Sequence, residues 1–393
     1  MIDPIASDKV RSLRDDLARA FPERTAVIDG SLAAVLASEH VLLLGPPGTA
    51  KSALCRAIAG AFGGRYFERL LTKFSTPDEL FGPVSLRALE ADRFERVTAG
   101  KLPEVEFGFI DEVFLANSAI LNSMLSLINE RVFHNDGTPL ACPLVTLFGA
   151  SNDLPEGREL EALFDRFLLR FDVQYLVQLA NLRAVLLAPD PGTSVRLTLA
   201  ELREAQAEAM AVPVTEETVD AMVAIRDALQ AEGVVASDRR WKRSLKLARA
   251  SSYILGGDRT SVEDLAILTD ALWREPRERS KVARVVGRHA DPVGAEAREI
   301  LESARETQAS VTALRAGERS TYVGAAVKAI DTFVEQKNKL AELSRTAGKR
   351  TKVTIDDALR EVQGMHAETR RVASASLGVV DRAVAAVRGV VEA

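Results

Sequence analysis

Short apolar runs alternate with helix-like stretches along the first half of the chain. The clearest runs are VLLLG (41–45), FGFID (107–111) and LVTLFGAS (144–151), with weaker ones at 65–71 and 170–176. Runs that are apolar at nearly every position are typical of strands buried on both faces, and intervening helices favour parallel pairing. The pattern therefore predicts an α/β fold in which a parallel sheet carries helices on both faces.

The periodicity becomes purely helical after the break at Pro189, Pro191 and Gly192. Residues 198–275 show helical spacing only, which predicts a compact helical domain. After Pro276 and Pro292, long helical patterns follow at 294–315, 319–346 and 354–391. Ala326, Ile330, Phe333, Lys337 and Leu340 alternate steps of three and four residues, as in a helical bundle or coiled coil.

These changes of pattern divide the chain into three predicted domains. Residues 1–190 would form the α/β domain with an N-terminal helix at 8–21. Residues 191–280 would form a helical lid, and residues 281–393 a C-terminal helical region. Within the first domain, Asp136-Gly137 between two apolar stretches predicts a β-hairpin turn.

Charge is spread unevenly along the chain. The formal net charge is −5; residues 276–393 contain 21 Lys and Arg against 16 Asp and Glu, a net +5, so the first 275 residues carry −10. An acidic first part argues against a nucleic-acid-binding surface, and the mixed signs of the tail indicate solvated helix faces.

Metal-ligand spacing is missing around Cys55, Cys142 and the four histidines, so we expect no bound transition metal. We expect the two cysteines to be small buried hydrophobes in a reducing compartment. The polar first residues do not resemble a signal peptide, and no apolar run reaches the ~20 residues that span a bilayer. We therefore expect a cytoplasmic protein without a membrane span.

A phosphate-binding loop is predicted at GPPGTAKS, between the strand at 41–44 and a helical stretch. Glycines allow close approach of the backbone, and N–H groups at a helix start attract phosphate. Lys51 would reach the β- and γ-phosphates and Ser52 would ligate Mg²⁺. Ala50 replaces the last glycine of the usual pattern, which is tolerable if Ala50 is helical; the alternative is a Gly/Pro turn that enters a structural helix. The predicted nucleotide-binding residues are Gly45, Pro46, Pro47, Gly48, Thr49, Ala50, Lys51, Ser52 and Ala53.

Polar side chains follow two further strands. Asp111 suits a place near the Mg²⁺ and Glu112 suits polarising the attacking water, although strands often end in solvated acids. Asn152 follows the strand at 144–151 and would hold the water or the γ-phosphate; a turn-capping role is the alternative. Strand ends in an open α/β sheet meet at the ligand-binding edge, which favours one shared site.

The order GPPGTAKS, FIDEV, GASN and LEALFDRFLLRF resembles the MoxR branch of AAA+ ATPases, and is most similar to the RavA group. The resemblance covers about residues 8–280 and does not extend beyond about 290. It implies an α/β ATPase domain with a helical lid, a homo-oligomeric ring of six subunits, and ATP with Mg²⁺ at subunit boundaries.

The resemblance also implies arginines that act on the nucleotide. Arg166 or Arg170 would be the arginine finger that reaches a neighbouring subunit, with Arg166 preferred by motif position. Arg239 or Arg240 would be a lid arginine acting in cis, with Arg239 favoured. A structural salt bridge for the first pair and a solvated helix start for the second are the alternatives.

Two insertions, at residues 76–104 and 131–144, resemble segments that face the pore or the substrate in related rings. Phe133 and His134 would then be contact residues, unless Phe133 packs on the core. The function implied is chaperone-like remodelling of a client protein, with a von Willebrand factor A domain protein as partner. A nucleic-acid motor and an ATP-dependent assembly scaffold are the rivals; Glu112 argues against the scaffold, since a scaffold needs no hydrolysis.

Overall fold

The structure is a computed structural model that describes residues 5–154, 157–187, 193–315, 319–347 and 349–391. The chain forms two compact units, residues 1–283 and residues 284–393. The first unit contains both the α/β domain and the lid. The predicted boundary at 190, with Pro189, Pro191 and Gly192, lies outside the described residues.

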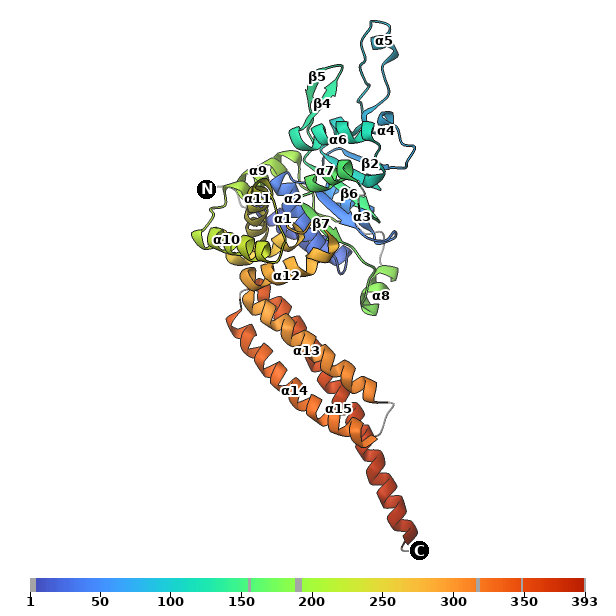
Figure 1. The fold of residues 1–393 in the computed structure, drawn as a ribbon, viewed down its shortest axis with the longest axis vertical. Helices are drawn as coiled ribbons and strands as arrows, with labels where there is room; N and C mark the ends of the chain where they lie inside the picture. The colour runs from blue at the N-terminus through green and yellow to red at the C-terminus, as the bar shows by residue number, and fades with distance from the viewer. Residues whose placement is uncertain (1–4, 155–156, 188–192, 316–318, 348, 392–393) are drawn as a thin grey trace. The chain divides into compact units, whose positions relative to one another are not determined.

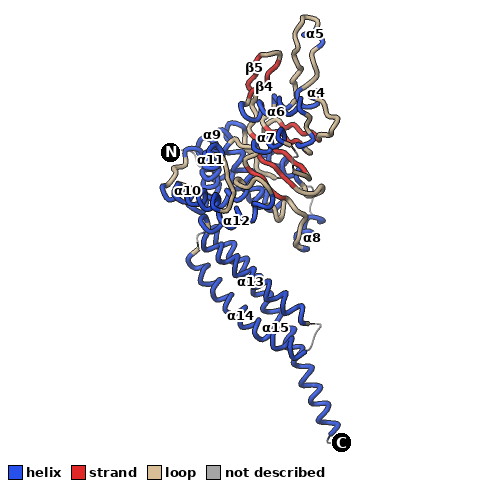
Figure 2. Tube along the Cα trace, viewed as in Figure 1, coloured by secondary structure: helices blue, strands red, loops and turns tan. Residues whose placement is uncertain are grey.

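A five-stranded sheet forms the centre of the first unit (Figure 2). Its order is β2-β3-β6-β1-β7, and every neighbouring pair is parallel. The three middle strands are buried almost throughout because helices cover the sheet, which confirms the α/β prediction. The strands are β1 (Val41–Leu44), β2 (Tyr66–Leu70), β3 (Phe107–Asp111), β6 (Thr146–Ser151) and β7 (Leu169–Asp172).

In the described residues, seven α-helices and two short 3-10 helices precede or connect these strands. The α-helix that precedes β1 is apolar on almost every side, and ten of its thirteen residues are buried. The α-helices are α1 (Ile5–Ala20), α2 (Thr25–Ala37), α3 (Lys51–Ala61), α4 (Pro77–Phe81), α5 (Leu86–Leu89), α6 (Ser118–Glu130) and α7 (Arg158–Arg166); the 3-10 helices are η1 (Leu102–Glu104) and η2 (Val113–Leu115).

The predicted hairpin is present as β4 (Val132–Asn135) and β5 (Thr138–Ala141), which pair antiparallel. Asp136 and Gly137 both have positive φ, 52° and 74°, as a two-residue type I′ turn requires. The sequence-based prediction of this turn is confirmed.

After β7, the described residues as far as 290 form helices and loops but no strand. Ser261 and Asp264 form a capping box, and the segment after them is a 3-10 helix. Pro276 begins a helix instead of marking a break, because proline is well accommodated in a first helical turn. The elements are α8 (Leu179–Leu187), α9 (Leu199–Ala211), α10 (Glu216–Ala231), α11 (Asp238–Leu255), η3 (Val262–Asp270) and α12 (Pro276–Ala290).

The second unit consists of three long helices that contact one another, α13 (Pro292–Leu314), α14 (Arg319–Thr346) and α15 (Lys349–Val391). Ala326, Phe333 and Leu340 on α14 are fully buried and seven residues apart. This burial confirms the predicted helical bundle. Within the described residues, no helix is both long enough and apolar enough to cross a membrane.

Candidate nucleotide-binding site

Three strands end at the same edge of the sheet. Leu44 at the end of β1 pairs with Ser151 at the end of β6, and Ile110 of β3 pairs with Gly149 of β6. The loop 45–52, the Asp111-Glu112 pair and Asn152 therefore emerge together at this carboxyl edge. The structure thus brings together the residues that the sequence predicted to share one site.

The loop after β1 has the backbone geometry of a cradle. Gly45 has φ 136°, and a Cβ atom there would lie 2.2 Å from the carbonyl oxygen of Val173. Gly48 has φ 78° and open space where a side chain would be. Only glycine satisfies both positions without strain. The space at Gly48 leaves room for a phosphate against the backbone.

Lys51 begins α3 and folds back over the loop. Its Nζ donates hydrogen bonds to the carbonyl oxygens of Gly45 (2.6 Å) and Pro46 (2.9 Å). Burial lowers the pKa of Lys51, while the negative charges of Asp111 and Glu112 oppose that shift. A lysine held between the loop and two carboxylates is suited to neutralising phosphate charge.

The backbone conformation of Ala50 is not the one that was expected from the sequence. We expected a helical conformation, but Ala50 has φ 64° and ψ 25°, in the left-handed region. An L-residue with a Cβ is disfavoured there by about 1–2 kcal/mol relative to its ordinary conformations. The loop keeps its shape at the expense of strain at this position.

Glu112 is held in one orientation by the end of β6. Its carboxylate accepts a 2.7 Å hydrogen bond from Nδ2 of Asn152, and Oγ of Ser151, whose proton is donated to the carbonyl oxygen of Asp153 at 2.8 Å, lies 3.5 Å away. Glu112 also has φ 51°, an unusual backbone conformation that is common at functional sites. These contacts favour the predicted interaction role over a freely solvated acid or a simple turn cap. Ser151 was not predicted, although it directly precedes Asn152 at the strand end.

The donor set fits Mg²⁺. Ser52 lies in the first turn of α3 with its side chain partly exposed, and Asp111 ends β3 at the same edge. Hydroxyl and carboxylate oxygens are the ligands that Mg²⁺ takes beside a phosphate. A cavity of about 760 Å³ opens at this edge between the loop, Asn152 and the lid residues Trp273 and Arg279. Its volume is in the range of small-molecule sites.

Arg170 does not fit the role of arginine finger. Its side chain is 1% exposed, stacks on the ring of Phe164 and donates to the carbonyl oxygens of Phe164 and Trp273. Asp165 lies 3.6 Å away. A guanidinium buried among groups of its own chain cannot reach a neighbour, so the structural alternative holds for Arg170.

Arg166, the last residue of α7, is partly exposed. The strand that follows Arg166 is β7, and its first residue, Leu169, pairs with Val41, the first residue of β1. Arg166 therefore lies beyond the amino edge of the sheet, while the phosphate loop lies at the carboxyl edge. Four residues of strand separate the two edges by roughly 13 Å.

The two candidate lid arginines also differ in burial. Arg240 is buried, whereas Arg239 is exposed. Burial and the charge of Arg239 both lower the pKa of Arg166, so these two arginines are close. Arg239 therefore lies near Arg166 at the amino edge, and this geometry does not support the implied role in cis. Arg240 donates to the carbonyl oxygens of Asp165, Phe167, Leu168 and Ala271 and to the carboxylate of Asp165.

The two insertions are joined to each other. The Asn135 side chain accepts from the Arg96 N–H (2.7 Å) and donates to its carbonyl oxygen (3.1 Å). Phe133 is buried, and its ring centroid lies 5.4 Å from that of Phe81 in a stacked arrangement. The prediction that Phe133 packs on the core is confirmed, and the prediction that it contacts a substrate is wrong. His134 is exposed, as a contact residue must be.

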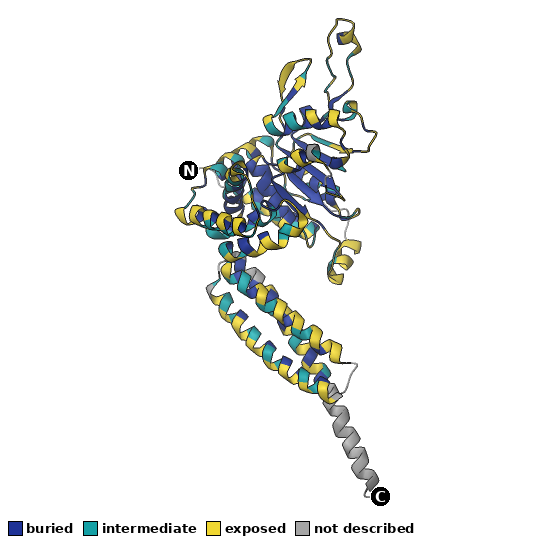
Figure 3. Ribbon diagram, in the orientation of Figure 1, coloured by how far each residue is buried: buried dark blue, intermediate teal, exposed yellow. Residues whose placement is uncertain are grey.

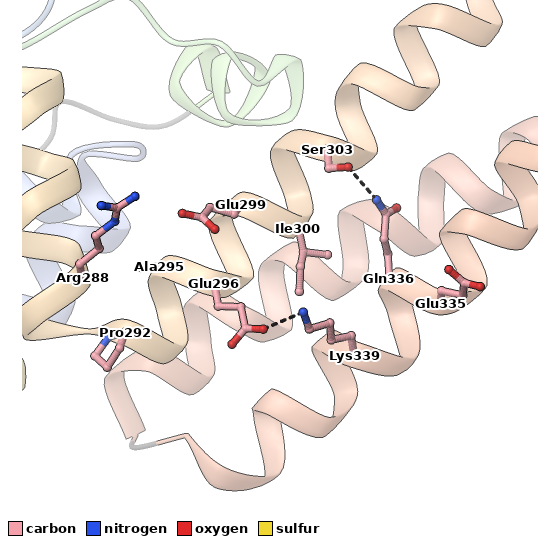
Figure 4. Close-up of a pocket in the computed structure, with 10 residues that line it drawn as sticks. All are labelled: Arg288, Pro292, Ala295, Glu296, Glu299, Ile300, Ser303, Glu335, Gln336 and Lys339. Carbon is pink, nitrogen blue, oxygen red and sulfur yellow. Dashed lines mark hydrogen bonds and ion pairs between the residues drawn. The ribbon is translucent and has the colours of Figure 1, made fainter.

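A further cavity of about 640 Å³ lies in the second unit between α13 and α14 (Figure 4). Two contacts join its polar groups: Lys339 with Glu296 at 2.8 Å, and Gln336 with Ser303 at 3.3 Å. Its lining contains neither a phosphate-binding loop nor a strand end, so it does not resemble the site at the sheet edge.

Family comparisons agree with this geometry. Residues 8–208 match the family described as the MoxR domain in the MoxR-vWA-beta-propeller ternary systems, and residues 217–286 match an AAA lid domain. The proteins MJ0812 and MJ0079 of Methanocaldococcus jannaschii are each 42% identical, over 299 and 280 residues. These alignments cover 75% and 71% of this chain and 80% and 73% of the relatives.

More distant similarity extends to a virus and to a solved structure. Structural protein ORF618 of Acidianus two-tailed virus is 25% identical over 260 residues, covering 62% of this chain and 38% of that protein. The crystal structure of a "putative ATPase" from Cytophaga hutchinsonii superposes with a TM-score of 0.60 at 18% identity, covering 72% of this chain and 95% of that one, which supports the fold. With its core and lid both matched, the chain belongs to the MoxR family of AAA+ ATPases.

Proposed function

We propose that this chain hydrolyses ATP with Mg²⁺ at the carboxyl edge of its sheet. The observation that carries the proposal is the orientation of Glu112, which Asn152 holds beside the phosphate loop. A structural turn or a solvated strand end has no need of such an arrangement. Phosphoryl transfer needs positioning and charge neutralisation, and this edge supplies both.

Each residue has a separate part in this proposal. Lys51 and the loop amides bind the phosphates, and Ser52 and Asp111 hold Mg²⁺, which neutralises charge on them. Glu112 orients and polarises the attacking water, and Asn152 keeps Glu112 in position. The residues of the loop, 45–53, provide the remaining contacts to the nucleotide.

We further propose that Arg166 and Arg239 both act on the nucleotide of a neighbouring subunit. Both lie at the amino edge of the sheet, roughly 13 Å from their own phosphate loop along β7 and β1. A head-to-tail contact would bring the amino edge of one copy against the carboxyl edge of the next. Repeated head-to-tail contacts close into a ring, and a hexamer is the ring that the family resemblance implies.

Mixing two defective subunits tests the shared site. Lys51→Ala subunits keep sound arginines, and Arg166→Ala subunits keep a sound cradle. Arg166→Ala alone should lose about 10³-fold or more in turnover, the usual contribution of an arginine finger, and Lys51→Ala alone should be nearly inactive because it lacks the lysine that binds the phosphates. An equal mixture should regain activity at interfaces that join the two sound halves. No recovery in rings that assemble would contradict a shared site.

A second mixture decides how Arg239 acts. If Arg166 and Arg239 both act in trans, every interface in a mixture of Arg166→Ala and Arg239→Ala subunits lacks one arginine, and activity stays low. If Arg239 acted in cis, some interfaces would combine a sound Arg166 with a sound Arg239, and activity would recover. We expect no recovery.

We propose that the energy of hydrolysis remodels a client protein, and that a von Willebrand factor A domain protein is the partner. The family description, which names MoxR together with vWA and β-propeller components, supports this choice. The exposed insertion at 76–104 and the hairpin at 131–144 offer surfaces for a client. The closer similarity to the RavA group rests on shared motifs and stays a prediction.

The rival functions make different predictions. A nucleic-acid motor would bind DNA with an affinity that falls as salt rises, and the −10 charge of the first 275 residues disfavours this. An assembly scaffold would bind ATP and oligomerise without turnover. Steady-state phosphate release that Glu112→Gln abolishes, with no stimulation by DNA, would support the remodelling ATPase over both.

A further inference from the structure

Glu39 is a buried acid to which the proposed reaction assigns no part. It lies between α2 and β1, two elements that are buried almost throughout (Figure 3), and its side chain is 5% exposed. The lid helix α11 packs against α2 (Figure 1) and brings two cations to this acid. The carboxylate accepts hydrogen bonds from Nε (2.8 Å) and Nη2 of Arg243, and Nζ of Lys246 lies 3.7 Å away. Because a buried charge is costly without a partner, these contacts fix Glu39 and Arg243 together.

Arg243 in turn binds the end of α7. Its Nη2 also donates to the carbonyl oxygen of Arg166, at 3.3 Å. Arg166 is the last residue of α7, and the last carbonyl groups of a helix have no partner within that helix. A cation is also favourable at this end of the helix dipole. Arg243 therefore caps α7 at the residue that we propose to act on a neighbouring nucleotide.

The other carbonyl groups at this helix end are bound from the same lid helix. Arg240, one turn before Arg243 on α11, donates to the carbonyl oxygens of Asp165, Phe167 and Leu168. Two arginines of α11 thus bind the carbonyl groups of four successive residues, 165–168. The path of the chain around Arg166 therefore depends on the lid as well as on α7.

Arg166 also lies among like charges. Burial lowers its pKa, and the charges of Arg239 and Arg243 lower it further, while Asp165 opposes them. Glu39 neutralises one of these two neighbouring arginines by its contact with Arg243. Without the carboxylate, Arg243 would be a largely buried cation with no such partner and would repel Arg166 more strongly.

We infer that Glu39 is a positioning residue for ATP hydrolysis: by holding Arg243, it fixes the helix end that carries Arg166. This inference rests on the proposed function, in which Arg166 acts on the nucleotide of a neighbouring subunit. Glu39 precedes β1, at the amino edge of the sheet, whereas the phosphate loop follows β1 at the carboxyl edge. Glu39 should therefore affect turnover in the neighbouring subunit and not nucleotide binding in its own.

Glu39→Gln tests the inference in the full chain, because the amide keeps the size of the side chain and removes the charge. In assembled rings, kcat should fall about 10- to 100-fold, as small misplacements of a reacting group can cause. The affinity for a fluorescent ATP analogue should stay within about threefold of the wild type, since the phosphate loop is unchanged. Wild-type kcat in Glu39→Gln would overturn the inference.

The matched control is Glu106→Gln. Glu106 is a similarly buried acid that pairs with Arg65 at 3.0 Å, and it lies just before β3. The same substitution there removes a buried charge without touching α11 or α7. Its kcat should stay within about twofold of the wild type. An equal loss in both variants would show that any buried charge has this effect, and the inference would be wrong.

Mixing experiments separate positioning from a general loss of structure. A Glu39→Gln subunit should have a sound cradle and a misplaced arginine, like Arg166→Ala. Mixed with Lys51→Ala subunits it should regain activity, and mixed with Arg166→Ala subunits it should not. If Glu39 only supported the fold of its own subunit, the cradle would be damaged too and Lys51→Ala would restore nothing. That result in rings that assemble would contradict the inference.

Two further variants keep the test independent of the folding of Glu39→Gln. Arg243→Lys keeps the buried charges balanced, but one ammonium cannot span Glu39 and the Arg166 carbonyl as a guanidinium does. Its kcat should fall about tenfold, with the same behaviour in mixtures. In an Arg166→Ala background, Arg243→Lys should cost less than about twofold, because residues that act as a unit are not additive. Wild-type turnover of Arg243→Lys, or an additive loss in the double variant, would refute the role of Glu39.

The two proposals fail in different ways. If Lys51→Ala and Arg166→Ala subunits do not complement each other, the shared site is wrong and the inference about Glu39 falls with it. If those two complement each other while Glu39→Gln and Lys51→Ala do not, the shared site stands and only the inference about Glu39 is wrong.

Discussion

Nδ2 of Asn152 donates a 2.7 Å hydrogen bond to the Glu112 carboxylate across the ends of two neighbouring strands, β6 and β3. The bond joins the two groups that we propose to position the attacking water. It also relates two residues that are 40 positions apart in the chain. Their separation is short because parallel neighbouring strands end at one edge.

Replacing Glu112 with Gln should separate binding from turnover. The amide keeps the size of the side chain but cannot accept a proton, so turnover should fall about 10²–10⁴-fold. Lys51 and the loop are unchanged, so the affinity for a fluorescent ATP analogue should stay within about threefold. Single-turnover phosphate release measures the first quantity and fluorescence titration the second. Wild-type turnover in Glu112→Gln would exclude the proposed role.

Asn152→Ala should lower kcat more than it raises KM. The reason is that Asn152 positions Glu112, which acts on the water and does not bind the phosphates. In a Glu112→Gln background the same change should cost little further activity, since residues that act as a unit are not additive. Steady-state kinetics of the two single variants and the double variant test this. Additive losses would mean that Asn152 acts independently, for example on the γ-phosphate.

Ala50→Gly should stabilise the first unit by about 1 kcal/mol, because glycine accepts the left-handed conformation of position 50. Ala53→Gly, three residues further along in α3, should destabilise by about 1 kcal/mol. Urea unfolding followed by tryptophan fluorescence reports on this unit, since both tryptophans, Trp241 and Trp273, lie in it. Destabilisation by both glycines would show that position 50 is not strained.

Asp270 should make folding stability depend on pH. Burial raises its pKa to about 6 from 3.8, despite Arg279 at 3.7 Å. The folded state then holds a proton that the unfolded state has lost, so the contribution of Asp270 to stability falls as pH rises from about 4 to 6. Two pKa units correspond to roughly 3 kcal/mol.

The variant Asp270→Asn should lack that pH dependence. Its urea midpoint should exceed that of the wild type above pH 6 and approach it near pH 4. The matched control Asp220→Asn changes an exposed acid on α10 and should leave the profile unchanged. A destabilised Asn variant at pH 7 would mean that the ion pair with Arg279 outweighs the cost of burial.

Asn135→Ala should loosen the insertion at 76–104. Asn135 binds both the N–H and the carbonyl of Arg96, so its loss should speed amide exchange at residues 94–97. His134→Ala, next to it on the exposed side of the hairpin, should leave that exchange unchanged. Hydrogen–deuterium exchange read by mass spectrometry compares the two. Equal exchange in both variants would mean that the insertion is held by other contacts.

Local patterns in the sequence determined the strands, the phosphate loop and the edge at which Asp111, Glu112 and Asn152 meet. These features follow from short apolar runs and from the residues directly after them, because parallel strands with helical crossovers must end together. The same applies to the turn at Asp136-Gly137 and to the seven-residue spacing on α14. Each depends on neighbours in the chain.

Only the tertiary structure decided between residues of equal chemistry. Arg166 and Arg170, like Arg239 and Arg240, carry the same group, and long-range packing buries one of each pair against carbonyl oxygens that are distant in sequence. Packing also buried Phe133 and placed Arg239 at the amino edge. Burial depends on which distant segments meet, and local periodicity does not contain that information. The leucines of α8 show the opposite difference: so apolar a sequence is typical of a buried helix, but the structure leaves these leucines exposed.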